Sequence, residues 1–133
     1  MTVAVTGATG HLGANLVRAL LAQGREVRAV TAEPLERTPP ALAGLPVERV
    51  QADVRDLVSV ERALRGADVV YNLAGRISVV NWDRKLLQEI NVTGVANVAE
   101  ACLRHGVGRL IQVSSVHALS PFPTGVPVDE QRP

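Results

Sequence analysis

The 133-residue chain has few of the residues that build disulfides, metal clusters and aromatic cores. Its single cysteine, Cys102, excludes an internal disulfide and a cysteine-ligated metal cluster. Aromatic residues make up only 2% of the chain, so its core must consist of Val, Leu, Ile and Ala. Apolar residues still amount to 47%, which excludes a disordered or purely linking role. These values indicate one globular domain of buried strands and covering helices.

Blocks of like charge and long apolar runs are also missing. The chain has 14 Lys and Arg residues against 13 Asp and Glu residues, and the basic ones are scattered. Nucleic-acid binding usually requires a clustered basic stripe with stacking aromatics, so we expect no nucleic-acid partner. No apolar run approaches the roughly 20 residues that cross a bilayer, and the N-terminus has no basic, apolar leader. We therefore expect no membrane association and a cytoplasmic location.

Hydrophobic patterns and turn residues predict alternating strands and helices. The predicted strands are 3–6, 26–31, 47–53, 68–73 and 109–115. The predicted helices are 11–23, a helix capped by Asp56 that ends before Gly66, and 82–105. This alternation predicts an α/β fold: a Rossmann-type, doubly wound parallel sheet in the order 3-2-1-4-5, with helices on both faces. We place this domain at residues 1–118, followed by a proline-rich loop at 119–133.

The longest predicted helix carries an asparagine on its apolar stripe. At about 100° per residue, one side of this helix contains Leu87, Ile90, Asn91, Gly94, Val98 and Ala101. Asn91 is therefore expected to be buried, where its amide must find hydrogen-bond partners or cost about 1–3 kcal/mol.

A glycine-rich loop connects the first strand to the first helix, which is the context of a dinucleotide-binding loop. Gly7 can form the tight turn, Gly10 lets the backbone approach a pyrophosphate, and Gly13 lets the helix pack against the sheet. The N–H groups at the start of the helix then point at the phosphates. The predicted cofactor contacts in this loop are Gly7, Thr9, Gly10, His11, Leu12 and Gly13. For His11 we expect the backbone to matter and the side chain to lie at the surface; a simple glycine-rich turn is the alternative.

The spacing Gly-x-x-Gly-x-x-Gly resembles that of the short-chain dehydrogenase/reductase superfamily. Residues 6–13 are similar to the version in its extended branch, the NAD-dependent epimerase/dehydratase family. Three later segments, 52–54, 72–75 and 91–98, resemble the family in order and spacing. Residues 113–119 with 127–130 are similar to dihydroflavonol-reductase-like and 3β-hydroxysteroid-dehydrogenase-like members. The resemblance covers essentially the whole chain and implies NAD or NADP as cofactor.

The resemblance also implies roles for residues at the ends of the third and fourth predicted strands. Asp53 would accept a hydrogen bond from the adenine amino group, within a turn that includes Val54. The adenosine and ribose would be lined by Leu73, Ala74 and Gly75.

In this family a Ser, a Tyr and a Lys carry the reaction, with the Tyr as general acid or base on the substrate oxygen. The resemblance favours Ser115 as the catalytic serine and Ser114 as the residue nearer the cofactor or the sheet; both could instead merely cap the strand. Asn91 would order a backbone bend or a proton-relay water, with a purely structural hydrogen bond as the alternative.

The family's Tyr-x-x-x-Lys pair is missing from these residues. Tyr71 and Lys85 are the only tyrosine and lysine, and they are not four positions apart. We therefore expect the chain to be inactive alone and to form the front part of a longer oxidoreductase acting on a hydroxyl or carbonyl group. The alternatives are part of a sugar-nucleotide epimerase or dehydratase, and a non-catalytic NAD(P)-binding module. The substrate, a small molecule, is not identified by any residue.

Two further features concern the choice of cofactor and the assembly. An acid at the end of the second strand favours NAD and a basic residue favours NADP, but residues 31–33 are Thr-Ala-Glu. Arg28 and Arg37 are candidates for binding a 2′-phosphate, and the choice stays open. Resembling proteins dimerise through the helix predicted at 82–105, which makes it the candidate homodimer interface.

Overall fold

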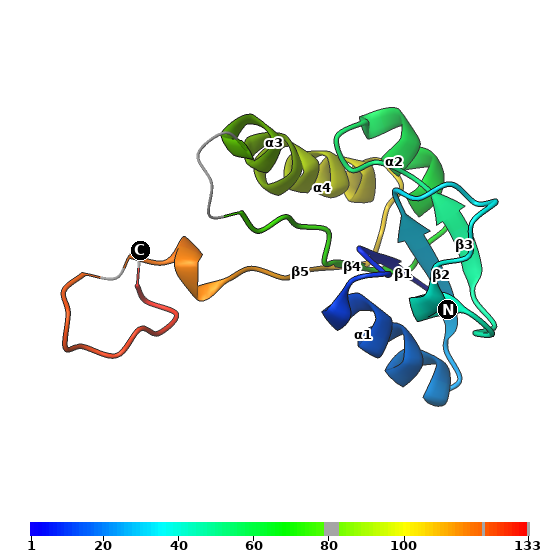
Figure 1. Ribbon diagram of the computed structural model, residues 1–133, viewed down its shortest axis with the longest axis horizontal. Helices are drawn as coiled ribbons and strands as arrows, with labels where there is room; N and C mark the ends of the chain where they lie inside the picture. Colours follow the sequence, from blue (N-terminus) through cyan, green and yellow to red (C-terminus); the bar gives the residue numbers. More distant parts are fainter. Residues whose placement is uncertain (79–82, 121, 133) are drawn as a thin grey trace.

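A five-stranded parallel sheet in the order β3-β2-β1-β4-β5 forms the centre of the computed structural model (Figure 1). The structure describes residues 1–78, 83–120 and 122–132. The strands are β1 (Thr2–Thr6), β2 (Glu26–Thr31), β3 (Glu48–Gln51), β4 (Val69–Asn72) and β5 (Arg109–Gln112). The predicted fold class and strand order are confirmed.

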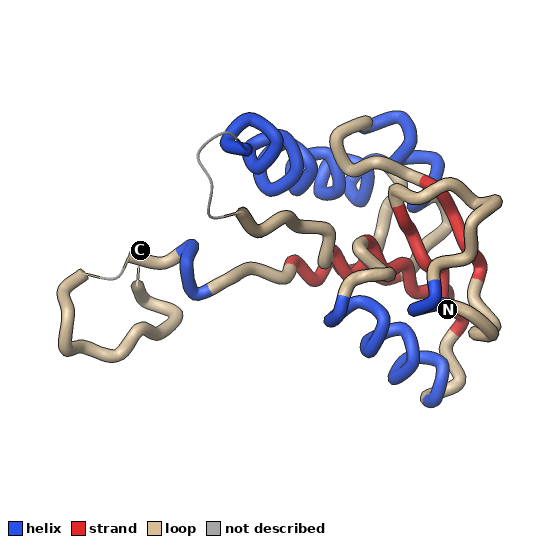
Figure 2. The backbone as a smooth tube through the Cα atoms, viewed as in Figure 1, coloured by secondary structure: helices blue, strands red, loops and turns tan. Residues whose placement is uncertain are grey.

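Helices cover both faces of this sheet (Figures 1 and 2). On one face lies α1 (His11–Ala22), and on the other lie α2 (Leu57–Leu64) and α4 (Gly94–Arg104). The remaining helical segments are η1 (Pro40–Leu42), α3 (Arg84–Gln88), the π-helical η3 (Glu89–Thr93) and η4 (Val116–Ala118). Every helix of the described residues is too short or too polar to cross a membrane.

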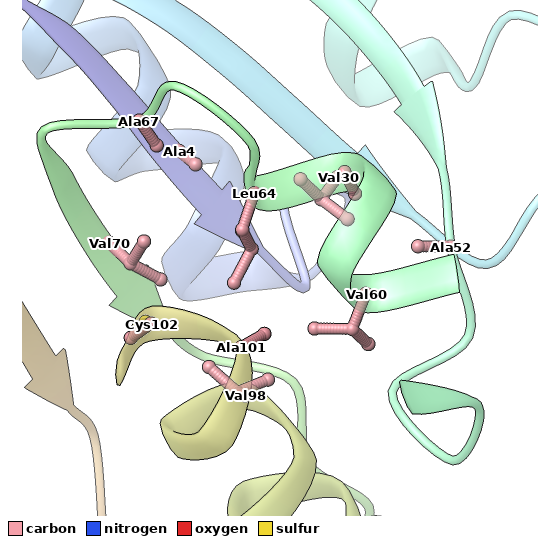
Figure 3. Packing of buried hydrophobic residues seen from close by; sticks show 11 residues of the cluster. Ala4, Val30, Ala52, Val60, Leu64, Ala67, Val70, Val98, Ala101 and Cys102 are labelled. Carbon is pink, nitrogen blue, oxygen red and sulfur yellow. The ribbon is translucent and has the colours of Figure 1, made fainter. Parts of the chain in front are cut away.

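The central strand β1 contributes to two separate apolar clusters because its side chains alternate between the two faces. Val3 and Val5 pack on the α1 side, whereas Ala4 belongs to the cluster under α2 and α4. Figure 3 shows the second cluster, in which Leu64 of α2 and Val98 of α4 meet over the sheet. The sheet is therefore packed against an apolar cluster on each of its two faces.

The helix predicted at 82–105 is interrupted. Residue 82 lies outside the described residues, and α3 and α4 are joined by the π-helical η3. The predicted burial of Asn91 is wrong, because Asn91 is exposed, while Leu87 and Ile90 are half-buried. A π-helix has i→i+5 hydrogen bonds and a wider turn, so a count of 100° per residue no longer holds across η3. The positions within α4, such as Val98, are buried as predicted.

The chain after β5 runs away from the sheet (Figure 1). β5 ends at Gln112 rather than at Ser115, and β3 is likewise shorter than predicted. After η4, the described residues 119–120 and 122–132 contain no helix or strand. The boundary between the domain and this loop remains a prediction.

We predict that Asp56→Ala lowers the free energy of unfolding by about 0.5–2 kcal/mol. Asp56 caps α2, because its Oδ1 accepts a hydrogen bond from the Val58 N–H at 3.1 Å. Urea unfolding checks this value. The control is Asp129→Ala, because Asp129 Oδ1 accepts the same kind of bond from the Gln131 N–H at 3.1 Å but caps no helix. An equal loss in both variants would contradict the capping role.

Candidate functional site

Two pockets lie side by side at the carboxyl edge of the sheet, where parallel α/β sheets bind ligands. The first has a volume of about 500 Å³ and the second of about 490 Å³, both within the range of about 300–1,000 Å³ that is usual for small-molecule sites. Leu73, Ala74 and Gly75, which follow β4, line both pockets and form their shared wall.

The first pocket collects residues from the glycine loop, three strand ends and the α3–η3 helix. It is lined by Thr6, Gly7, Thr9, Gly10, Val30, Thr31, Ala32, Ala52, Asp53, Val54, Arg55, Leu73, Ala74, Gly75, Leu86 and Ile90. Most of the predicted cofactor contacts are therefore brought together. Arg55, Leu86 and Ile90 were not predicted, because they become neighbours of the loop only through the packing of η3 and the turn after β3.

Close backbone approach explains two of the three loop glycines. Gly7 has a φ of +63°, and a Cβ there would lie 2.8 Å from the carbonyl carbon and oxygen of Leu73. A Cβ on Gly13 would lie 2.2 Å from the Gly7 carbonyl oxygen, so Gly13 allows α1 to pack against the loop itself rather than against the sheet. Gly10 has an ordinary φ of −69°. Its lack of a side chain therefore leaves room in the pocket that it lines.

The N-terminus of α1 presents free N–H groups beside this loop. Gly10 is the N-cap and supplies no side-chain hydrogen bond, and the first turn contains no acidic residue. The Ala14 N–H donates to the Gly10 carbonyl at 2.9 Å, so by helix geometry the preceding N–H groups of His11, Leu12 and Gly13 have no intrahelical acceptor. The side chains of His11 and Leu12 are exposed, and neither residue lines the first pocket, so a role of their backbone stays a prediction. The helix dipole makes this end attractive to an anion.

A buried polar chain connects the loop to the shared wall. The Thr6 hydroxyl donates to Asn72 Oδ1 and accepts from the Ala74 N–H at 3.2 Å. Asn72 Nδ2 donates in turn to Gln112 Oε1 at 2.7 Å, which extends the chain from β1 through β4 to β5. Thr6 and Asn72 are each only 1% exposed, so these bonds satisfy groups that water cannot reach.

The turn after β3 places one carboxylate in the first pocket. Arg55 Nη2 lies 2.5 Å from Asp53 Oδ2, and this guanidinium holds the pKa of the Asp53 carboxyl below its usual range. Partial burial acts in the opposite direction but more weakly. Asp53 therefore presents an ionised carboxylate at neutral pH.

The second pocket brings together the two predicted catalytic residues, Ser115 and Asn91, and the predicted cofactor contact Ser114. Ser114, Ser115 and Asn91 all line it, and both serines are exposed beyond the end of β5. Asn91 Oδ1 accepts from the Arg76 N–H at 2.9 Å, and its Nδ2 donates to the Arg76 carbonyl at 2.8 Å. Both ends of the amide are thus used to hold the backbone that follows the shared wall.

Arg28 is not available to a phosphate at the first pocket. Its guanidinium binds Glu48 at 2.7 Å and the carbonyls of Ala63 and Arg65 at 3.0 and 2.8 Å, at the C-terminal end of α2. Of the residues at the end of β2, the pocket is lined by Thr31 and Ala32. The choice between NAD and NADP stays open on this geometry.

Comparisons with known proteins point to one family. Residues 3–133 match the model of the NAD dependent epimerase/dehydratase family. The chain is 45% identical over 125 residues to sterol demethylase protein B of Methylococcus capsulatus, which covers 94% of this chain and 38% of that protein.

Two solved structures resemble the fold closely. A short-chain dehydrogenase/reductase superfamily protein from Agrobacterium tumefaciens with bound NAD superposes with a TM-score of 0.85 at 29% identity, covering 100% of this chain and 38% of that one. The UDP-glucose 4-epimerase of Thermus thermophilus in complex with NAD gives a TM-score of 0.83 at 32% identity, covering 100% of this chain and 44% of that one. The chain therefore spans less than half the length of these relatives.

We predict that Asn91→Ala increases hydrogen exchange of the amides at residues 74–78 by about tenfold, because two hydrogen bonds that hold Arg76 are lost. Mass spectrometry of the exchanged protein measures this change. The control is Val92→Ala, an exposed position on the same π-helical segment. Unchanged exchange in Asn91→Ala would show that other contacts hold this segment.

Proposed function

Because the chain belongs to the NAD-dependent epimerase/dehydratase family, we propose that it binds NAD or NADP in the first pocket, as the dinucleotide-binding part of a longer oxidoreductase. The observation that carries this proposal is the geometry of that pocket. It places the free N–H groups of a helix N-terminus and an ionised carboxylate along the same edge of the sheet. A dinucleotide needs both, because its phosphates are anionic and its adenine carries an amino group that donates hydrogen bonds.

The proposed contacts follow the walls of the pocket. The pyrophosphate lies over the glycine loop and the helix start, at Gly7, Thr9, Gly10, His11, Leu12 and Gly13. Asp53 and Val54 bind the adenine, and the wall formed by Leu73, Ala74 and Gly75 lines the adenosine and ribose. The wall is shared, so the far end of the dinucleotide reaches the second pocket.

Ser115 is the proposed catalytic serine in that second pocket. Ser115 is an exposed residue that lines the same pocket as Ser114, and a serine hydroxyl there would hydrogen-bond a substrate oxygen and orient a hydroxyl or carbonyl group. The nicotinamide ring supplies hydride transfer when the cofactor is bound. Ser114 lies toward the cofactor, and Asn91 is a positioning residue that acts through the backbone of Arg76.

A sugar-nucleotide epimerase or dehydratase is the second candidate for the longer protein. The likeness to the Thermus thermophilus UDP-glucose 4-epimerase at 32% identity favours it, because the likeness spans the whole of this chain. A homodimer through the helical region 82–105 and a cytoplasmic location remain predictions from the sequence.

We predict that Gly10→Val lowers the affinity for the dinucleotide by at least about tenfold, because the branched side chain would occupy the pyrophosphate position. The variant should still fold, since Gly10 has a φ of −69° and a Cβ there meets only the Gly7 carbonyl oxygen, at 3.3 Å. Calorimetric titration with NADH and with NADPH measures the affinities.

The matched control for this titration is Ala96→Val, which adds the same branch at an exposed position of α4 outside both pockets. No binding of either dinucleotide by the unmodified chain would refute the proposed function. Unchanged affinity in Gly10→Val would show that the loop is not the binding site.

The 133-residue chain alone should catalyse no reaction, because its only tyrosine and its only lysine do not form the family's acid–base pair. Tyr71 is half-buried in β4 and packs with the apolar cluster on the α1 side, while Lys85 pairs with Glu89 on the helix surface. Incubation with NAD or NADP and a panel of secondary alcohols should give no absorbance of reduced nicotinamide. Measurable reduction would contradict this assignment of the acid–base chemistry to residues outside the chain.

A further inference from the structure

Asp53 and Arg55 are the charged residues among those described that line the first pocket. Arg55 holds the Asp53 carboxylate through three separate N–H groups. Its backbone N–H donates to Oδ1 at 3.0 Å, Nε lies 3.0 Å from both oxygens, and Nη2 lies 2.5 Å from Oδ2. The carboxylate is therefore held in one orientation rather than being free to rotate.

This arrangement limits the number of further hydrogen bonds that the Asp53 carboxylate can accept. A carboxylate has about four lone-pair positions, and Arg55 offers it three hydrogens, of which the Nε hydrogen is shared between the two oxygens. Three hydrogens for about four positions leave room for about one further donor from the pocket. Because the pKa of Asp53 is lowered mainly by its hydrogen bond to Arg55, that position stays an acceptor and does not become a donor at neutral pH.

The guanidinium is itself braced from the helix that closes the pocket. Arg55 Nη1 lies 3.6 Å from Glu89 Oε2, and Glu89 Oε1 lies 3.8 Å from Lys85 Nζ. The neighbouring backbone is held as well, because Asn97 Nδ2 donates to the Val54 carbonyl at 2.8 Å. The turn at 53–55 is therefore fixed against η3 and α4.

We propose that Arg55 is a positioning residue that makes Asp53 selective for the base of the dinucleotide, so that the pocket binds adenine in preference to hypoxanthine. The inference rests on the proposed function. Adenine offers an amino group that donates to the remaining lone pair, whereas hypoxanthine has a carbonyl oxygen at the same place, which the carboxylate repels. Without Arg55 the carboxylate can turn away, and this discrimination is lost.

The test is the ratio of the dissociation constants of reduced nicotinamide hypoxanthine dinucleotide and NADH, measured by calorimetric titration. We expect a ratio of about ten or more for the unmodified chain, as for a hydrogen bond to a charged group. It should fall to within about threefold in Arg55→Met and in Asp53→Ala. Arg55→Lys should restore part of the ratio, because it keeps the positive charge but not the planar fork of donors.

The matched control is Arg104→Met. Arg104 also pairs with two carboxylates, those of Glu61 and Glu100, on a surface outside the pocket. Removal of this guanidinium should leave the ratio of dissociation constants unchanged. This result would show that the loss of any surface ion pair is not enough to lower the ratio. Thermal unfolding of each variant identifies any that does not fold. If Arg55→Met does not fold, the ratio in Arg55→Lys is compared with that of the unmodified chain.

Three results would overturn the inference. If the ratio of dissociation constants is unchanged in Arg55→Met but lost in Asp53→Ala, Asp53 acts without Arg55. If the ratio is unchanged in both variants, other residues select the base. A loss of NADPH affinity alone in Arg55→Met would show that Arg55 binds the 2′-phosphate instead. No binding of any dinucleotide by the unmodified chain would refute the proposed function itself, and is distinguished by that complete absence.

Discussion

The close approach of the glycine loop to the end of β4 is the constraint on which both pockets depend. At Gly7 the backbone lies so near Leu73 that no side chain fits between them, and the Thr6 hydroxyl fastens the Ala74 N–H beside it. This contact determines where the backbone of Leu73 and Ala74, which both pockets share, lies relative to the glycine loop. A polar chain through Asn72 then connects the wall to Gln112 of β5, so hydrogen bonds link the loop, the wall and β5.

Two helical contacts complete this edge of the sheet, and both come from the interrupted helix. The π-helical segment η3 projects Asn91 toward the backbone of Arg76, and Glu89 of the same segment reaches Arg55 on the opposite pocket. π-helical segments are rare and often occur at functional sites. Here neighbouring residues of one helical segment support the first pocket, through Glu89 and Arg55, and the second pocket, through Asn91 and Arg76.

The fold was predictable because its signals are local. Apolar strands alternate with amphipathic helices, whose ends are marked by residues such as Asp56 and Gly66. This order predicts a parallel sheet with right-handed crossovers and leaves few alternatives. The glycine loop was predictable for the same reason, since its spacing and position are both visible in the chain. The burial of Asn91 was not, because the periodicity argument assumes an uninterrupted α-helix and η3 changes the count.

By itself, the sequence determined the fold class, the strand order, the loop glycines and the family, because backbone conformation and apolar periodicity depend on neighbouring residues. Only the tertiary structure decided which charged side chains share a pocket. Arg28 and Arg55 look equivalent in the sequence, yet packing commits Arg28 to the distant end of α2, whereas Arg55 pairs with Asp53 within its own turn. That this local pair lines the first pocket beside the glycine loop depends on contacts between distant elements, and side-chain charge alone contains no information about those contacts.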